Sequence, residues 1–225
     1  MKLKDKLVLI TGGSSGIGQV LIKLLHQKGA RIISFDIKDP KESFSDVAYI
    51  KADISKSAQV KRSLTRIKEP IDILINNAGI IRRGTLLETT EEEFSELFNV
   101  LVRGVWLMLK YARPKLINTA IILQISSRYG LSLPPDPGVY ALCKRIIIDM
   151  SRMLQEIYPH FTVKLACPGP VDTPLSRHSC SQEEFSRKIK IMISSEEMAE
   201  KIIKLLESDY KKLIFNEEDN KYEYS

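Results

Sequence analysis

Short apolar runs alternate with amphipathic segments along most of the chain. The runs are rich in β-branched residues and have the length of strands; they occupy residues 7–10, 31–35, 47–50, 71–75, 119–125 and 162–166. Between the first two runs, apolar residues recur at helical spacing. Strands that alternate with helices predict an α/β fold built on a parallel sheet.

Sequence signals for helix ends support this alternation. Helix starts are predicted at Ser55, Thr90 and Ser194, and a glutamate follows the last two after three residues, as in a capping box. Gly29 stands where a C-terminal cap belongs. The tail, residues 212–224, predicts a last strand and a turn.

Two segments are expected to form loops near a site. One is proline-rich, residues 134–138, and the other is the polar stretch 176–195. We expect residues 174–195 to supply a substrate loop and a helix. The polar stretch contains no low-complexity repeat and does not resemble an interdomain linker.

Composition indicates one folded domain over residues 1–225. Of 225 residues, 44% are hydrophobic and 28% are charged, which is ordinary for a globular protein and excludes disordered and fibrous classes. No apolar run has membrane-spanning length, and the first residues lack a secretion signal. The expected location is the cytoplasm, without membrane association.

Charge and metal-ligand residues narrow the class further. The formal charge is +6, but basic residues are interspersed with acidic ones, so a solvated surface is favoured over nucleic-acid binding. Cys143, Cys167 and Cys180 are an odd set without metal-ligand spacing, and the three histidines stand far apart. We expect no metal site and no disulfide framework.

A glycine-rich turn lies between the first strand and its helix. Its candidate phosphate-binding residues are Gly12, Ser14, Ser15, Gly16, Ile17 and Gly18. Glycines at such a turn let backbone amides approach a pyrophosphate at the helix N-terminus. The alternative is a tight turn that only packs the helix on the strand.

Asp36 ends the second strand, eighteen residues after Gly18. A carboxylate at this point can accept hydrogen bonds from an adenosine ribose, whereas a 2′-phosphate would meet negative charge. This favours NAD, although nearby Lys38 leaves NADP possible. Asp36 could otherwise be a solvent-facing strand end.

A tyrosine and a lysine four residues apart suggest acid–base chemistry. Tyr140 and Lys144 share one face of an apolar helix, where the cation is expected to lower the tyrosine pKa. Ser127 follows a buried strand, thirteen residues before Tyr140, where parallel sheets place ligands. A tyrosine–lysine pair alone is more often structural.

Together these motifs resemble the short-chain dehydrogenases/reductases. The matching residues are Thr11-Gly12-x-x-x-Gly16-Ile17-Gly18, Asn76-Asn77-Ala78-Gly79, Ser127, Tyr140-x-x-x-Lys144 and Pro168-Gly169-Pro170-Val171-x-Thr173. The resemblance implies a Rossmann-type doubly wound sheet of about seven strands with helices on both faces. It also implies an NAD(P)-dependent oxidoreductase that interconverts a small-molecule alcohol and carbonyl by hydride transfer.

The resemblance assigns roles to single residues. Tyr140 would exchange a proton with the substrate oxygen, Ser127 would hydrogen-bond that oxygen, and Lys144 would bind the nicotinamide ribose. The further cofactor contacts that it implies are Asp53, Ile54, Asn77, Ala78, Gly79, Pro168, Gly169, Val171 and Thr173. By themselves, residues 76–79 could be a strand-end turn and residues 168–174 a plain loop.

Leu101 departs from the family pattern. Relatives often have an asparagine there, which helps to hold a proton-relaying water; Asn99 does not substitute, because two residues turn a helix to nearly its opposite face. The alternative function is therefore a cofactor-binding regulatory or scaffold protein with weak or no turnover. The resemblance also implies a homodimer or homotetramer, although the charged C-terminus departs from relatives that form the usual tetramer contact.

Three arginines stand near the expected mouth of the site. Arg82, Arg83 and Arg128 suggest an anionic substrate, but three ordinary solvated side chains are the favoured interpretation. The sequence does not identify the substrate further.

Overall fold

The centre of the protein is an eight-stranded sheet. The structure is a computed structural model and describes residues 2–179, 185–186 and 188–225. The strands of this sheet are β1 (Leu7–Thr11), β2 (Arg31–Asp36), β3 (Ala48–Lys51), β4 (Ile71–Asn76), β5 (Leu116–Ile125), β6 (Thr162–Cys167), β9 (Lys212–Asn216) and β10 (Lys221–Tyr224). Their spatial order is β10-β9-β6-β5-β4-β1-β2-β3, and only β10 is antiparallel to its neighbour. The predicted α/β class is confirmed.

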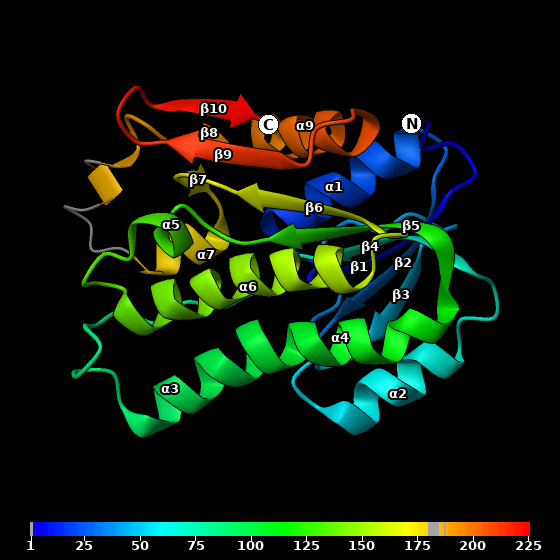
Figure 1. The fold of residues 1–225 in the computed structure, drawn as a ribbon, viewed down its shortest axis with the longest axis horizontal. Coiled ribbons are helices and arrows are strands. Elements are labelled where there is room, and N and C mark those ends of the chain that lie inside the picture. The colour runs from blue at the N-terminus through cyan, green and yellow to red at the C-terminus, as the bar shows by residue number, and fades with distance from the viewer. Residues whose placement is uncertain (1, 180–184, 187) are drawn as a thin grey trace.

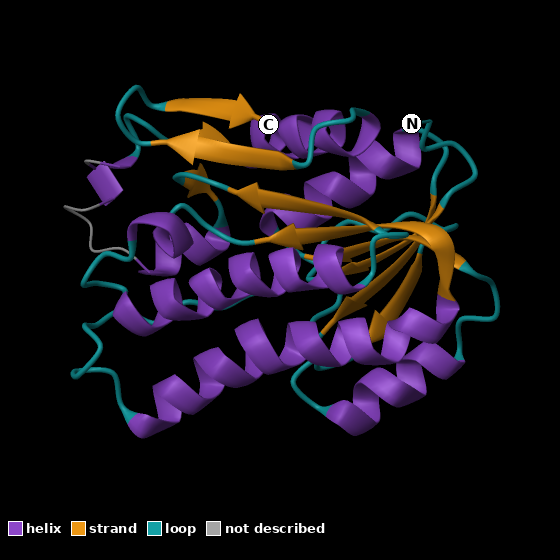
Figure 2. Cartoon of the chain, in the orientation of Figure 1, coloured by secondary structure: helices purple, strands orange, loops and turns teal. Residues whose placement is uncertain are grey.

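Helices cover both faces of the sheet (Figures 1 and 2). They are α1 (Gly16–Gln27), α2 (Ser57–Thr65), α3 (Glu91–Phe98), α4 (Val105–Ala112), α5 (Tyr129–Ser132), α6 (Gly138–Ile157), α7 (Pro174–Ser179) and α9 (Ser195–Glu207). A π-helical segment, η1 (Asn99–Gly104), joins α3 to α4, and a 3-10 turn, η2 (Arg113–Lys115), follows α4. One apolar cluster packs α1 and α9 against the sheet, and another packs α2 and α4 against its opposite face.

The strand order changes its direction of progress across the sheet at β1. β1 is fully buried and pairs in parallel with β2 on one side and with β4 on the other. The chain therefore adds β2 and β3 on one side of β1 and then crosses over to add β4, β5 and β6 on the other. Open parallel sheets bind ligands outside the carboxyl ends of strands at such a reversal. In Figure 1 the neighbouring parallel strands β5 and β6 point to the left, toward α5 and α7, so the carboxyl edge of the sheet is on that side.

Two predicted helix starts are confirmed and one is wrong. Thr90 and Glu93 form a reciprocal capping box, and the Ser194 hydroxyl accepts the Glu197 N–H. The helix predicted at Ser55 begins at Ser57 instead, because Asp53 Oδ1 accepts hydrogen bonds from the Ser55 N–H and hydroxyl and holds Ser55 in a turn.

The C-terminal half contains more regular structure than predicted. The tail forms the hairpin β9–β10 rather than one strand and a turn, which gives eight strands in place of about seven. In the expected loop, residues 174–179 form α7, and a short strand β8 (Ile193–Ser194) pairs with β7 (Val171–Asp172). Residues 180–184 and 187, including Cys180, lie outside the described part of the chain.

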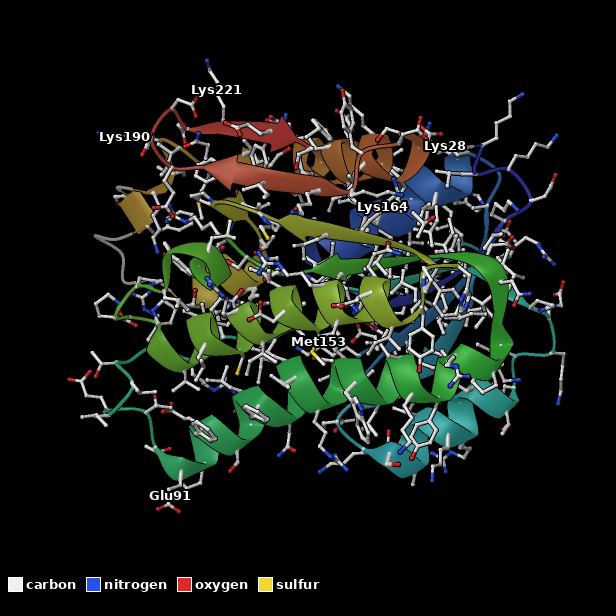
Figure 3. All side chains as sticks on the ribbon, viewed as in Figure 1. Lys28, Glu91, Met153, Lys164, Lys190 and Lys221 are labelled. Carbon is white, nitrogen blue, oxygen red and sulfur yellow. The ribbon has the colours of Figure 1, made fainter. Side chains whose placement is uncertain are left out.

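A buried lysine of β6 binds backbone carbonyls at the C-terminal end of α9. Lys164 on β6 is 1% exposed, and its ammonium donates hydrogen bonds of 2.7–2.8 Å to the carbonyls of Leu205, Ser208 and Tyr210 (Figure 3). These include carbonyls that a helix C-terminus leaves without partners. Lys164 therefore joins the sheet to the chain that leads into β9.

The face formed by α3, α4 and α6 carries exposed apolar side chains. Trp106 on α4 is 45% exposed and Met153 on α6 is 58% exposed. Met153 is labelled in Figure 3. Among the helices that the structure describes, none is long and apolar enough to span a bilayer.

Candidate active site

The glycine-rich turn is tied to the end of β4 by Asn77. The Asn77 amide donates to the carbonyl oxygens of Thr11 and Gly12 at 3.0 and 2.9 Å, and the Thr11 hydroxyl accepts the backbone N–H groups of Asn77 and Ala78. Gly12 has a φ of +72°, a conformation that favours glycine. The Asn77 side chain therefore fixes the turn, a use that the motif did not indicate.

Gly18 allows α1 to approach this turn. A Cβ on Gly18 would lie 2.0 Å from the Gly12 carbonyl oxygen and 2.5 Å from Asn77 Nδ2. Ser15 at the N-cap of α1 makes no side-chain capping hydrogen bond. The N–H groups of the first turn of α1 are therefore not capped by the Ser15 side chain, and a helix N-terminus of this kind can bind an anion.

Asp36 faces the glycine-rich turn from the end of β2. Its Oδ2 accepts the Ser14 N–H at 2.9 Å and its Oδ1 accepts the Lys38 N–H at 2.9 Å. The Ser14 hydroxyl donates to the Lys38 carbonyl at 2.7 Å. The carboxylate is thereby oriented beside the turn rather than free in solvent.

Ser127 and Tyr140 line one pocket. Ser127 lies just beyond β5 and Tyr140 is the third residue of α6, so the sheet and the helix bring them together from separate parts of the chain. The described residues enclose a cavity of about 90 Å³, and its walls include Ser127, Arg128, Tyr129, Tyr140, Gly169 and Leu175. The two predicted residues thus share a small pocket.

Lys144 lies behind Tyr140. Its side chain is 5% exposed, and Nζ donates to the Ile125 carbonyl at 3.0 Å and lies 5.7 Å from the centre of the Tyr140 ring. Burial lowers the pKa of Lys144 to about 8, because the charged form loses hydration. The lysine is therefore protonated at neutral pH and loses its charge as the pH passes 8.

The electrostatics of Tyr140 correct one prediction. The lysine was expected to lower the tyrosine pKa, but burial raises the pKa of Tyr140, and hydrogen bonding with Ser127 opposes this effect only in part. The reason is that the phenol is withdrawn from solvent on all sides. Tyr140 is consequently a neutral phenol at neutral pH and can donate a proton.

Leu101 occupies the wall next to the lysine. It is 1% exposed within the π-helical segment η1 and packs in one cluster with Tyr140. A Cβ on Gly79 would lie 3.4 Å from Leu101 Cδ2 and 3.8 Å from Lys144 Nζ, so leucine carbons and the ammonium approach the same point. Asn99 is exposed, and the expectation that it does not replace the missing asparagine agrees with this position.

Asp53 and Ile54, which are expected to contact the cofactor, also have contacts within the protein. Asp53 Oδ1 accepts both the N–H and the hydroxyl of Ser55. Ile54 is 5% exposed, and a Cβ on Gly104 would lie 3.0 Å from it, so it packs against η1. Both residues follow β3 at the carboxyl edge of the sheet.

The C-terminal hairpin supports the loop 168–173. Tyr222 accepts the Gly169 N–H on its hydroxyl at 3.1 Å, and a Cβ on Gly169 would lie 2.4 Å from the Phe215 ring. The Thr173 hydroxyl, directly before α7, accepts the Ser176 N–H of the first turn of that helix. The sequence did not predict Phe215 and Tyr222, because only the pairing of β9 with β6 brings them to this loop.

The three arginines have different surroundings. Arg82 pairs with Glu96 at 2.7 Å outside the pocket. Arg83 lines the pocket but pairs with Asp136 at 2.6 Å. Arg128 lines the pocket with a side chain that is 16% exposed. In the described part of the chain, no three His, Cys, Asp or Glu side chains are grouped as a metal site would require.

Known proteins are similar to this chain over most of its length. A family profile described as short chain dehydrogenase matches residues 6–184. The chain is 34% identical over 198 residues to Oxidoreductase UcpA of Salmonella typhimurium, covering 80% of this chain and 75% of that protein.

Solved structures are similar over most of the chain. A short chain dehydrogenase family protein from Francisella tularensis superposes with a TM-score of 0.83 and 27% identity, covering 91% of this chain and 92% of the other. A short chain dehydrogenase from Leptospira borgpetersenii, solved with bound NAD+, gives a TM-score of 0.78 at 29% identity and covers 92% and 87%.

Proposed function

Because the chain belongs to the short-chain dehydrogenase family, we propose that it is an NAD(P)-dependent oxidoreductase that interconverts a small alcohol and its carbonyl. The observation that carries this proposal is the convergence of Ser127 and Tyr140 on one pocket, with Lys144 behind them. A nicotinamide cofactor would supply or accept the hydride. The bound NAD+ of the Leptospira relative supports this choice of cofactor.

The residues divide the proton chemistry among them. Tyr140, a neutral phenol in its buried position, donates its proton to the carbonyl oxygen during reduction. Ser127 hydrogen-bonds the same oxygen and stabilises its developing charge. Lys144 binds the nicotinamide ribose and, as a cation, stabilises the phenolate that proton donation leaves.

The cofactor would lie along the carboxyl ends of β1, β2 and β4. The N–H groups at the start of α1 bind the pyrophosphate, and Asp36 accepts hydrogen bonds from the adenosine ribose. Asp53 and Ile54 lie toward the adenine, and the segments 77–79 and 168–173 line the remaining length. A panel of small aldehydes and ketones with NADH and with NADPH tests the proposal, since a scaffold protein would bind the cofactor without consuming it.

We expect NADH to be preferred over NADPH by at least about tenfold in kcat/KM, because a 2′-phosphate would lie against the Asp36 carboxylate. Asp36→Asn removes the negative charge and keeps the shape, so the preference should shrink by about the same factor. Steady-state kinetics with both cofactors measure this. Asp39→Asn is the matched control, because Asp39 is an exposed residue of the same loop; an equal shift in that variant would contradict the assignment.

Reduction should depend on pH through Lys144. Its pKa is lowered to about 8, so the ammonium is present below this pH and is lost above it. Because Tyr140 stays protonated over the same range, kcat/KM should be constant near pH 7 and fall about tenfold per pH unit above 8.

Lys144→Met provides the control for this profile. The variant lacks the titrating amine, so its kcat/KM should be low at every pH and show no inflection near 8. A wild-type profile that stays flat for two pH units above 8, or a Lys144→Met profile that keeps the inflection, would rule out this role.

A further inference from the structure

Arg128 is the least exposed of the three arginines near the site. It directly follows Ser127, lines the same pocket as Tyr140, and its side chain is 16% exposed, against 32% for Arg83 and 38% for Arg82. Its backbone N–H donates to the Pro168 carbonyl at 2.9 Å. The backbone of Arg128 is therefore tied to the segment after β6, and its side chain lies at the wall of the pocket, next to a residue proposed to bind the reacting oxygen.

Aromatic rings hold the guanidinium in place. Its central carbon lies 4.8 Å from the centre of the Tyr129 ring and 5.8 Å from that of Phe215. Such stacking restricts an arginine without using its N–H donors. Tyr129 also packs edge-on against Tyr140, with the ring centres 6.5 Å apart, so Arg128 and Tyr140 are joined by one ring.

The carboxylate that pairs with Arg128 is exposed to solvent and makes one contact with the guanidinium. Glu217, in the turn between β9 and β10, approaches NH1 at 3.2 Å and is 46% exposed. The only other hydrogen bond from the guanidinium to a side chain, within the described residues, runs from NH2 to the Tyr129 hydroxyl at 3.4 Å. Most of the five N–H donors thus remain for a ligand. By contrast, Asp136 binds Arg83 at 2.6 Å and also accepts the Gly84 N–H.

We propose that the substrate carries a carboxylate, which binds Arg128 while its carbonyl or alcohol oxygen faces Ser127 and Tyr140. This inference rests on the proposed function. Arginine presents paired N–H donors that match a carboxylate, and a buried position strengthens the bond. Ser127, Tyr140 and Arg128 line one pocket, so a short oxo acid or hydroxy acid can reach all three side chains. The ligand would share the guanidinium with Glu217 or displace it.

Matched pairs of substrates test this proposal. The probes are 2-oxobutanoate, acetoacetate and 4-oxopentanoate, each compared with its methyl ester at saturating cofactor. At least one acid should exceed its ester tenfold or more in kcat/KM. Arg128→Gln should lower the value for that acid roughly 10- to 100-fold and the value for the ester less than threefold. Arg82→Gln, the control at an arginine outside the pocket, should change neither.

Glu217→Gln separates ligand binding from a structural role of the ion pair. Both this variant and Arg128→Gln remove the Arg128–Glu217 pair. If the pair only held the hairpin in place, both variants would act alike on acids and esters. If Arg128 binds the carboxylate, Glu217→Gln should instead lower KM for the acid severalfold, because a competing anion is removed.

The outcomes distinguish this inference from the proposed function. Reduction of esters or simple ketones at rates equal to those of the acids, or an equal loss for both in Arg128→Gln, overturns the carboxylate site and leaves the oxidoreductase intact. If no carbonyl is reduced, the proposed function fails. Binding is then decisive: quenching of NADH fluorescence by the three acids should weaken at least tenfold in Arg128→Gln, and an unchanged affinity overturns the site.

Discussion

Tyr140→Phe should lower kcat for carbonyl reduction by about 100- to 10,000-fold and leave the affinity for NADH unchanged. The substitution removes only the hydroxyl from a ring that is buried in the cluster with Leu101 and Val139, so packing is kept. The proton donor is lost while the glycine-rich turn is untouched. Stopped-flow reduction kinetics and NADH fluorescence titration measure the two quantities separately.

Tyr129→Phe is the matched control for this result. Tyr129 lines the same pocket and contacts the Tyr140 ring, so the variant removes a second hydroxyl from the same surroundings. Its kcat should stay within a few-fold of the wild-type value. Equal losses in both variants, or full activity in Tyr140→Phe, would disprove the assignment of Tyr140 as the proton donor.

Gly18→Ala should destabilise the protein by about 1–3 kcal/mol or more and weaken NADH binding strongly. The added methyl group would lie 2.0 Å from the Gly12 carbonyl oxygen, and a backbone atom cannot move aside as a flexible side chain can. α1 must therefore shift away from the turn that is proposed to hold the pyrophosphate. Chemical denaturation and NADH titration measure the two effects.

Gly79→Ala controls for the loss of a glycine. A Cβ on Gly79 would lie 3.4 Å from Leu101 Cδ2, an ordinary contact with a side-chain methyl, so the stability of this variant should stay near that of the wild type. If Gly18→Ala unfolds at the same denaturant concentration as Gly79→Ala, the close contact between α1 and the turn has no energetic weight.

Local patterns were sufficient to predict the fold class. Alternating apolar runs and helix caps depend on neighbours in sequence, which is why the capping box at Thr90 and the strands β1 to β6 could be predicted. The predicted start of α2 was wrong because the Asp53 carboxylate accepts the Ser55 N–H and holds that residue in a turn before the helix. The prediction of the β9–β10 hairpin was incomplete because β10 has only four residues, Lys221–Tyr224, too few for its alternation of polar residues and tyrosines to indicate a strand.

In the candidate site, too, local contacts could be predicted from the sequence and contacts between distant residues could not. Spacing within one helix predicted that Tyr140 and Lys144 lie together, and motif order predicted Ser127. The direction of the Tyr140 pKa shift was wrong, since it depends on burial by residues distant in the chain. The contacts of Arg128 with Phe215 and Glu217 could not be predicted, because they arise only when β9 pairs with β6.

Leu101 restricts what the site can do without changing its assignment. A leucine beside the Lys144 ammonium cannot hold a relaying water by its side chain. If Tyr140 is the proton donor as proposed, its proton must be replaced by a route that does not use a side chain at position 101.

Transfer of deuterium from NADH labelled at the reactive carbon of the nicotinamide tests the central claim most directly. With an accepted carbonyl substrate, mass spectrometry should find one deuterium on the carbinol carbon of the product from the wild-type protein, and product from Tyr140→Phe should form at least 100-fold more slowly. Cofactor binding without deuterium in any product would contradict the account and leave a nucleotide-binding protein without redox chemistry.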